Sequence, residues 1–285
     1  MRSIVIKQKV GTDPNFLVIG AQKCATTWLS RNIGQHPDSF VPTVDEIHFF
    51  NRQANYQKGI EWYQSQFVGY SGQKAVGEFT PNYLWTSENH QEITENNHNY
   101  DIPKLVKKHY PDIKLIVSLR NPVKRAISSY YHQIRKKRVH PSSSILDVAH
   151  QHGIISMGFY DVHLKKWFEY FDRDSFLILI LEEDIIQNCE TTLKKVYEFI
   201  GVDSNFIPTN AGKKVHDRRN DFYTHASYYL PEPVAKALDT ILPRKLREAD
   251  LWKITIPESE IEELKQIYAR HNEELSSLIQ REIKW

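Results

Sequence analysis

The segment GAQKCATTW, residues 20–28, combines residue types that suit the binding of an anion. Lys23 supplies a positive charge, and Thr26 and Thr27 supply two hydroxyl donors at what we expect to be the first turn of a helix. A loop that leaves a strand and opens a helix also directs unpaired backbone N–H groups, and the positive end of the helix dipole, at one point. A phosphate at that point would receive charge, backbone donors and side-chain donors together.

This segment resembles the P-loop of ATP-binding proteins without matching it. The P-loop pattern G-x-x-x-x-G-K-[ST] has its lysine directly before the hydroxyl that holds magnesium. Here Lys23 stands three residues before Thr26, and the second glycine is absent. Taken alone, the segment therefore fits a capped helix with a solvated lysine as well as it fits a binding site.

A second set of candidate residues follows the segment KLIVSLR, which begins at Lys114. Arg120 stands at the expected carboxyl end of a strand, and Ser128 stands two turns into the helix that follows. In a parallel sheet, such strand ends face the same crevice as the loop of Lys23. Each residue alone fits an ordinary surface position, but together the two anchors predict a ligand that carries phosphates at two separated positions.

The elements that must position these residues are short apolar runs followed by helical patterns. The runs typical of strands buried on both faces are FLVIG (16–20), KLIVSLR (114–120) and FLILIL (176–181). Asn121 and Pro122 are typical of a helix cap and first helical residue, Gly201 is typical of a helix end, and further helices are expected over 160–171 and 257–283. This alternation predicts an α/β fold with a central parallel sheet flanked by helices and a P-loop-like phosphate-binding loop.

Composition favours an ordinary globular protein. The chain has 37 Lys+Arg and 35 Asp+Glu, so its charge gives no general attraction to nucleic acid or to anionic membranes. Its length and 40% hydrophobic content predict a single domain over residues 1–285. Cys24 and Cys189 are too few for a disulfide framework, and no stretch resembles a signal peptide or reaches the roughly 18 apolar residues of a membrane span. We therefore expect a cytoplasmic protein.

Together, the motifs resemble those of sulfotransferases that use 3′-phosphoadenylyl sulfate (PAPS). QKCATTWL resembles their 5′-phosphosulfate loop, and SLRNPVKRAISSYY resembles their 3′-phosphate motif. The resemblance covers nearly the whole chain, through DEIHFFN (45–51), KGIEWYQSQF (58–67), GEFTPNYLW (77–85) and GFYDVHLKKWFEYF (158–171). The chain is most similar to the branch that contains the glycosaminoglycan (heparan sulfate) N- and O-sulfotransferases and their bacterial relatives.

The resemblance implies a nucleotide site. The residues implied around the 5′ end of the nucleotide are Lys23, Ala25, Thr26, Thr27 and Trp28, and those implied at its 3′-phosphate are Arg120 and Ser128. The family also covers the nucleotide with a late basic loop, whose counterpart here is NAGKKVHDRRN (210–220), with Lys213, Lys214 and Arg218 as binding residues. The Lys-Gly-Arg form of the family is absent from it, so a charged surface turn is an equal alternative.

The resemblance also implies a catalytic base. The Glu-x-His-Phe-Phe pattern of the branch recurs here with Glu46 as the base and His48 as the alternative base. The chemistry needs such a group, because an acceptor hydroxyl is a poor nucleophile until its proton has been taken up. We expect Phe49 and Phe50 to shield the Glu46 carboxylate from water, and Lys23 to stabilise the leaving phosphate.

Two features depart from the branch. In the segment GEFTPNYL the branch usually carries lysine where this chain has Phe79, so one cation near the acceptor is lost. The late cysteine pair of the secretory-pathway members is also missing, which favours an intracellular enzyme. Glu78 is retained, and its role is open between acceptor binding and orientation of Lys23.

These residues predict a PAPS-dependent sulfotransferase that acts on an acceptor hydroxyl, or less favourably on an amine, and leaves adenosine 3′,5′-bisphosphate. The expected acceptor is a small molecule or a glycan, and no metal site is expected because no Cys or His cluster has zinc-ligand spacing. One alternative is a P-loop nucleotide kinase or NTPase, for which Glu182, Glu183 and Asp184 are the acidic residues after a strand. The other is a non-catalytic nucleotide- or polyanion-binding module on the same fold.

Overall fold

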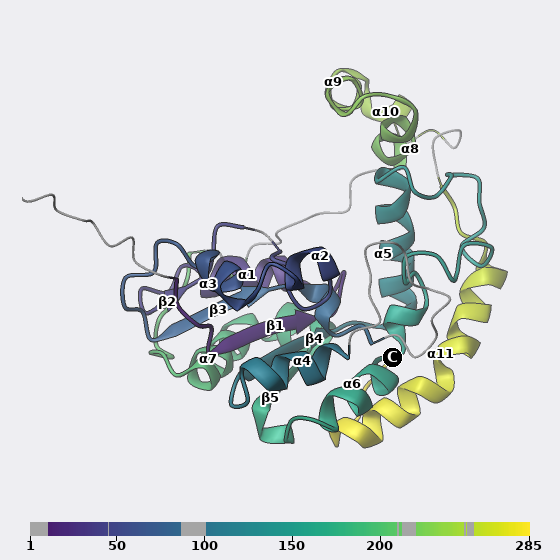
Figure 1. Cartoon of the computed structure of the whole chain (residues 1–285). Helices are drawn as coiled ribbons and strands as arrows, with labels where there is room; N and C mark the ends of the chain where they lie inside the picture. Colours follow the sequence, from purple (N-terminus) through teal and green to yellow (C-terminus); the bar gives the residue numbers. More distant parts are fainter. Residues whose placement is uncertain are drawn as a thin grey trace, which may run out of the picture. The chain divides into compact units, whose positions relative to one another are not determined.

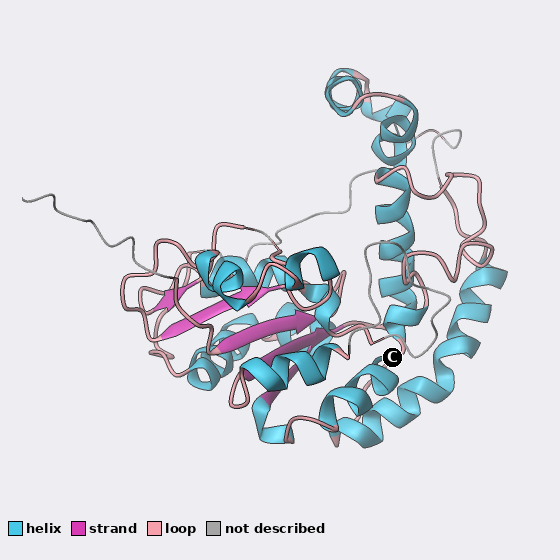
Figure 2. Ribbon diagram, in the orientation of Figure 1, coloured by secondary structure: helices cyan, strands magenta, loops and turns pink. Residues whose placement is uncertain are grey.

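The chain divides into two compact units, residues 1–120 with 163–213 and residues 121–162 with 214–285. In the computed structural model, the described residues are 11–44, 46–86, 101–209, 211–212, 221–247, 249 and 254–285. All strands of the described chain belong to the first unit, and the described part of the second unit contains helices and loops (Figure 2). A single domain over residues 1–285 stays a prediction.

The first unit is built on a five-stranded parallel sheet flanked by helices (Figure 1). Its strands are β1 (Phe16–Gly20), β2 (Ser39–Phe40), β3 (Ala75–Phe79), β4 (Lys114–Leu119) and β5 (Phe176–Ile180). They lie in the order β2-β3-β1-β4-β5, and every pairing is parallel. The predicted fold class, an α/β fold with a central parallel sheet and a P-loop-like loop, is confirmed.

Helices of different lengths complete the described chain. Those of the first unit are α1 (Thr26–Ile33), α2 (Gln53–Tyr56), α3 (Ile60–Ser65), α4 (Ile102–His109) and α7 (Cys189–Ile200), with the short 3-10 helices η1 (Pro81–Tyr83) and η4 (Arg173–Ser175) and the π-helix η5 (Leu181–Gln187). Those of the second unit are α5 (Pro122–Arg135), η3 (Ser156–Gly158), α8 (Asp221–Tyr229), α9 (Glu232–Ile241), α10 (Arg244–Arg247) and α11 (Glu258–Ile279). Helix α6 (Tyr160–Phe168) begins in the second unit and ends in the first.

The central strand β1 is buried along its whole length between β3 and β4. Its first residue, Phe16, lies opposite Gly77 of β3 in the register. The ring of Phe16 covers this glycine so closely that a Cβ atom at position 77 would lie 2.4 Å from two ring carbons. Glycine is therefore required at position 77 by packing, because a side chain there would collide with the neighbouring strand.

Local signals located the predicted helices, but two strands were missed. The Asn121 side chain accepts a hydrogen bond from Lys124 N at 3.0 Å and caps α5, and Gly201 ends α7 with a φ of 82°. The third predicted strand ends one residue early, because Leu181 begins the π-helix η5. The missed strands are β2, which has two residues, and β3, whose apolar run is interrupted by Gly77 and Glu78.

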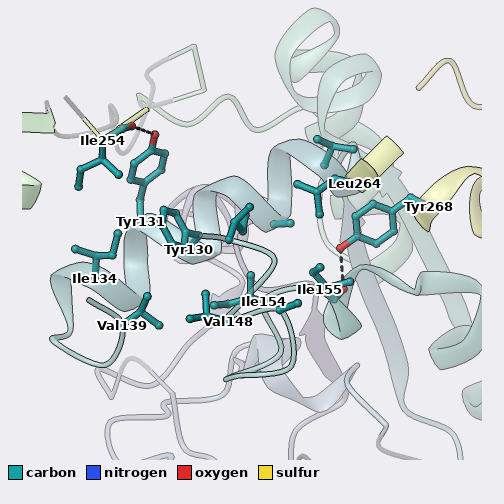
Figure 3. Close-up of a cluster of buried hydrophobic side chains, with 14 residues drawn as sticks. Tyr130, Tyr131, Ile134, Val139, Val148, Ile154, Ile155, Ile254, Leu264 and Tyr268 are labelled. Carbon is teal, nitrogen blue, oxygen red and sulfur yellow. Dashed lines mark hydrogen bonds between the residues drawn. The ribbon is translucent and has the colours of Figure 1, made fainter. Parts of the chain in front are cut away.

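The second unit has a core of its own, formed by α5, α11 and the loops between α5 and η3 (Figure 3). Two tyrosines tie its segments together: Tyr131 donates to the Ile254 carbonyl at 2.6 Å, and Tyr268 donates to the Ile155 carbonyl at 2.8 Å. Arg125 is fully buried in this unit and donates through Nη2 to the carbonyls of Gly153 and Ile154. These bonds hold the loop before η3 against α5.

We predict that Gly77→Ala destabilises the protein by about 1–3 kcal/mol, because the added methyl group must displace the buried ring of Phe16. Gly212→Ala is the matched control, since a Cβ atom there meets no heavy atom within 4 Å among the described residues. Urea unfolding of both variants measures the change in the free energy of unfolding. Equal stability of the two variants would contradict the packing argument.

Candidate functional site

The loop between β1 and α1, residues 21–25, has a backbone shape that suits an anion. Lys23 and Ala25 both adopt left-handed conformations, with φ of 69° and 67°. Alternation between right-handed and left-handed residues turns successive N–H groups toward one side and forms an anion-binding concavity. Within the described part of the chain, the N–H groups of Ala25, Thr26 and Thr27 meet no acceptor.

The end of β4 braces this loop from the neighbouring strand. The Ala21 N–H donates to the Ser118 carbonyl at 2.8 Å, and the Ser118 hydroxyl donates to the Cys24 carbonyl at 2.6 Å. Arg120, which follows β4 directly, donates from Nη1 to the Lys23 carbonyl at 3.3 Å. The two strands thus place the Arg120 guanidinium beside the loop of Lys23, at one edge of the sheet.

The other predicted nucleotide residues fall at different places in the chain. Thr26 is buried and Thr27 is exposed in the first turn of α1. Ser128 is half-buried on α5, which belongs to the second unit. As nucleotide ligands, all three stay predictions.

Trp28 connects α1 to a late segment of the chain. Its side chain is almost fully buried, and its indole N–H donates to the Ala211 carbonyl at 3.0 Å. Ala211, one of the two described residues of the predicted basic loop, therefore lies beside α1. Lys213, Lys214 and Arg218 themselves lie outside the described residues, and their role stays a prediction.

Glu46 and His48 form a close pair. Their Oε2 and Nε2 atoms lie 2.9 Å apart, and the Glu46 side chain is 41% exposed whereas that of His48 is 10% exposed. The other ring nitrogen of His48, Nδ1, lies 3.2 Å from Asn51 Oδ1. The predicted base and the predicted alternative base are therefore in direct contact with each other.

This contact pattern determines where a proton can lie. Asn51 presents a carbonyl oxygen, which can only accept, so Nδ1 of His48 carries a hydrogen. Nε2 of His48 and Oε2 of Glu46 lie 2.9 Å apart, within hydrogen-bond distance, so a proton on either group can be shared between them. The arrangement can take up and release a proton at an exposed carboxyl oxygen, as proton transfer from a hydroxyl requires.

The prediction that Phe49 and Phe50 shield the Glu46 carboxylate is wrong. Both rings are fully buried and face the interior, where Phe49 stacks on Tyr63 at a centroid distance of 4.7 Å. Phe50 packs edge-on against Tyr83 at 5.5 Å. The two phenylalanines anchor the segment in the core, and Glu46 remains open to solvent.

Glu78 lies at the end of β3 and is 2% exposed. Its carboxylate accepts hydrogen bonds from Tyr63 at 2.8 Å, Thr80 at 2.7 Å and Tyr83 at 2.9 Å. Burial raises the pKa of Glu78, and these three hydrogen bonds oppose that rise. Its hydrogen bonds are thus with three hydroxyls, and acceptor binding and orientation of Lys23 both stay predictions.

The segments meet along the carboxyl ends of β3, β1 and β4, which are neighbours in the sheet. Gln22 in the loop after β1 donates to Asn82 in the turn after β3 at 3.4 Å. The N–H of Thr80 donates to the Val18 carbonyl at 3.2 Å, and the N–H of His48 donates to the Thr80 hydroxyl at 3.4 Å. The Glu46–His48 pair and the loop of Lys23 are therefore attached to adjacent strands.

The sequence did not reveal the contact of Asn51 with His48 or the three hydroxyl contacts of Glu78. Asn51 stands three residues after His48, a spacing that is visible in the sequence but not specific by itself. Glu78 offered a clearer signal, because a carboxylate within an otherwise apolar strand must find donors in the protein interior. Its donors Tyr63 and Tyr83 come from other elements, which only the fold reveals.

Comparison with known proteins gives a family and three informative relatives. The family model described as the sulfotransferase domain matches residues 13–273. Heparan sulfate glucosamine 3-O-sulfotransferase 5 of Mus musculus is 29% identical over 179 residues, which cover 58% of this chain and 47% of the relative. Bifunctional heparan sulfate N-deacetylase/N-sulfotransferase 4 of the same species is 28% identical over 288 residues, covering 94% of this chain and 30% of the relative. The chain thus spans less than half the length of either protein.

A third relative and a solved structure extend this comparison. Membrane-associated sulfotransferase kil1 of Dictyostelium discoideum is 36% identical over 135 residues, covering 46% of this chain and 26% of the relative. The crystal structure of a sulfotransferase from Alicyclobacillus acidocaldarius superposes with a TM-score of 0.66 and 23% identity, covering 95% of this chain and 98% of that chain. The superposition supports the fold.

The prediction of a cytoplasmic location is wrong. The matched relatives include enzymes named for heparan sulfate and a sulfotransferase named as membrane-associated, and these point away from the cytoplasm. Among the described residues, no helix has both the length and the apolar character needed to span a bilayer.

We predict that the stability of the parent relative to Glu78→Gln decreases as the pH rises above 4.5, the ordinary pKa of the carboxyl group. Because burial raises the pKa of Glu78, the folded state binds this proton at pH values where the unfolded chain has lost it. The parent then loses stability as the pH rises from the pKa of Glu78 in the unfolded chain to its pKa in the folded protein. Glutamine does not titrate, so Glu78→Gln lacks this dependence. Urea unfolding at a series of pH values measures it, with the exposed Glu61→Gln as control. A relative stability that increases with pH would contradict the raised pKa.

Proposed function

The chain belongs to the sulfotransferase family, and on this premise we propose that it transfers a sulfuryl group from PAPS to an acceptor hydroxyl. The acceptor oxygen forms a bond to sulfur while the bond from sulfur to the bridging phosphate oxygen breaks. The electron pair of that bond stays with adenosine 3′,5′-bisphosphate, the leaving group. The hydroxyl proton passes to the protein.

In this proposal the loop of Lys23 binds the 5′ end of the nucleotide. The left-handed residues Lys23 and Ala25 orient the loop amides, and the N–H groups at the start of α1 add donors. Negative charge grows on the bridging oxygen as its bond to sulfur breaks. The Lys23 ammonium and the amides therefore bind the transition state more tightly than the ground state.

Arg120 and Ser128 hold the 3′-phosphate in the same proposal. A guanidinium suits a phosphate because its N–H groups match two phosphate oxygens. The hydrogen bond from Arg120 to the Lys23 carbonyl supports this assignment, because it couples the position of the guanidinium to the shape of the loop. Lys213, Lys214 and Arg218 would cover the nucleotide, and Trp28 would pack beside it.

The Glu46–His48 pair accepts the proton of the acceptor hydroxyl. Glu46 is the proposed base because its carboxyl group is the more exposed member of the pair. His48, held by Asn51, orients the carboxylate and stabilises its charge. A glycan hydroxyl is the acceptor favoured by the names of the heparan sulfate relatives, and an amine is the less favoured one.

One observation carries the proposal: the family match extends over residues 13–273 and so includes both the anion-binding loop and the Glu46–His48 pair. A nucleotide kinase or a non-catalytic module would account for the loop alone. The proton-transfer pair is the feature that favours group transfer to a hydroxyl.

We predict that the protein binds adenosine 3′,5′-bisphosphate in preference to ATP with magnesium, as titration calorimetry can measure. Arg120→Ala should weaken binding of the bisphosphate about 10- to 100-fold, the loss expected for hydrogen bonds to a charged group. Lys124→Ala, which removes an exposed cation from the first turn of α5, is the matched control. Preference for ATP with magnesium would favour the kinase alternative instead.

We also predict that Glu46→Gln lowers kcat about 10²- to 10⁴-fold, with little change in the affinity for adenosine 3′,5′-bisphosphate. Turnover is measured with labelled PAPS and a panel of glycan and small-molecule acceptors, and Glu61→Gln is the control. Retained turnover in Glu46→Gln together with its loss in His48→Gln would assign the base to His48. A parent that binds the bisphosphate but turns over no acceptor would identify a binding module.

A further inference from the structure

The segment that carries Glu46 and His48 has an unfavourable backbone conformation at its centre. His48 has a φ of 54°, in the left-handed region that residues other than glycine rarely adopt. Such a conformation persists only where the surrounding structure holds it firmly. The bonds that hold residues 47–50 therefore determine where the Glu46–His48 pair stands.

Two hydroxyls take up the N–H groups of this turn. The Thr80 hydroxyl accepts from His48 N at 3.4 Å, and the Tyr83 hydroxyl accepts from Phe49 N at 2.9 Å and from Phe50 N at 3.4 Å. On the opposite side, the Asn55 amide donates to the Ile47 carbonyl at 3.0 Å. The turn is thus held through consecutive N–H groups by two residues of the segment that follows β3.

Each of these hydroxyls can accept because its own hydrogen points elsewhere. Thr80 donates to one oxygen of Glu78 and Tyr83 donates to the other. A hydroxyl has one hydrogen and two lone pairs. When the carboxylate accepts the hydrogen bond from that hydrogen, the lone pairs of the hydroxyl are directed at the turn. Glu78 thereby sets the direction of both hydroxyls, although it touches neither Glu46 nor His48 by hydrogen bond.

Tyr63 supplies an internal comparison. It donates to Glu78 Oε1 at 2.8 Å, nearly the same distance as Tyr83, and it is equally buried. Among the described residues, however, the Tyr63 hydroxyl takes up no N–H of the turn. The three hydroxyls therefore donate to one carboxylate, but among the described residues only those of Thr80 and Tyr83 also accept hydrogen bonds from the N–H groups of residues 48–50.

From this arrangement we propose that Glu78 is a positioning residue that fixes the Glu46–His48 pair through Thr80 and Tyr83. The inference rests on the proposed function in that the pair is taken as the proton acceptor of the reaction. A carboxylate buried at the end of β3 serves the reaction without contact to acceptor or donor. It orders two hydroxyls, these order three N–H groups, and the ordered turn aims the base.

The test compares Tyr83→Phe with Tyr63→Phe. Each substitution removes one hydroxyl from the same carboxylate oxygen and keeps the ring, so the two variants differ chiefly in the N–H groups of the turn. Tyr83→Phe also frees the N–H groups of Phe49 and Phe50, and we expect kcat to fall about 10- to 100-fold because the base is misplaced. The KM for PAPS should stay within about threefold, whereas Tyr63→Phe should lower kcat by less than about threefold.

Thr80 gives a second comparison. Thr80→Val removes the acceptor of the His48 N–H and should lower kcat as Tyr83→Phe does, whereas Thr80→Ser keeps the hydroxyl and should restore most of the activity. Equal losses of kcat in Tyr83→Phe and Tyr63→Phe would overturn the proposal, because a purely structural role would not distinguish them. Loss of activity in Thr80→Ser to the level of Thr80→Val would overturn it as well.

A readout that needs no turnover separates this inference from the proposed function. Hydrogen–deuterium exchange of a peptide covering residues 46–51 should become faster in Tyr83→Phe and Glu78→Gln and remain near the parent rate in Tyr63→Phe. If the parent transfers no sulfuryl group, the proposed function fails, and the exchange rates still decide whether Glu78 holds the turn. Unchanged exchange in Tyr83→Phe would overturn the inference even in an active enzyme.

Discussion

Parallel pairing of β3, β1 and β4 is the constraint on which the site depends. Parallel strands place all their carboxyl ends at one edge of the sheet, so the segments that follow them are neighbours although they are far apart in sequence. Hydrogen bonds from the ends of β3 and β4 to the backbone of the first strand and its loop then fix these segments relative to one another. The chemistry of the site is distributed over three loops, but its geometry comes from one sheet.

The loop and the turn at this edge both use left-handed residues other than glycine. In an ATP-binding P-loop, glycine supplies such conformations without strain. Here Lys23, Ala25 and His48 adopt them, each at an energetic cost that neighbouring bonds offset. The Ser118 hydroxyl and the Arg120 guanidinium hold the loop, whereas Thr80 and Tyr83 hold the turn. The side chains proposed to bind and react, Lys23 and His48, can therefore stand at positions where glycine would offer no side chain.

The fold was largely predictable from the sequence. Three of the buried strands appear as continuous apolar runs, and helix ends are marked by capping residues such as Asn121 and Gly201. Phe16–Gly20 and Asn121 show this, since each is decided by residues next to it in the chain. β3 was missed because Gly77 and Glu78 interrupt its apolar run. Gly77 is explained by the ring of Phe16 on the neighbouring strand, and Glu78 is explained by donors such as Tyr63 on a helix, so neither could be interpreted from the strand alone. Within the site, the resemblance of DEIHFFN to the family pattern indicated Glu46 and His48. It could not indicate that Phe49 and Phe50 face inward, because that depends on the rings of Tyr63 and Tyr83.

The bond between Trp28 and Ala211 limits how this tryptophan can recognise anything that packs against it. An indole has a single polar hydrogen, and the Ala211 carbonyl occupies it. The rest of the ring is apolar and only 6% of the residue is exposed, so a neighbouring molecule meets a small flat surface that distinguishes planarity and size but not the pattern of heteroatoms on a heterocycle. Under the proposed function, discrimination between one purine and another at this position would accordingly come from main-chain groups or from other side chains.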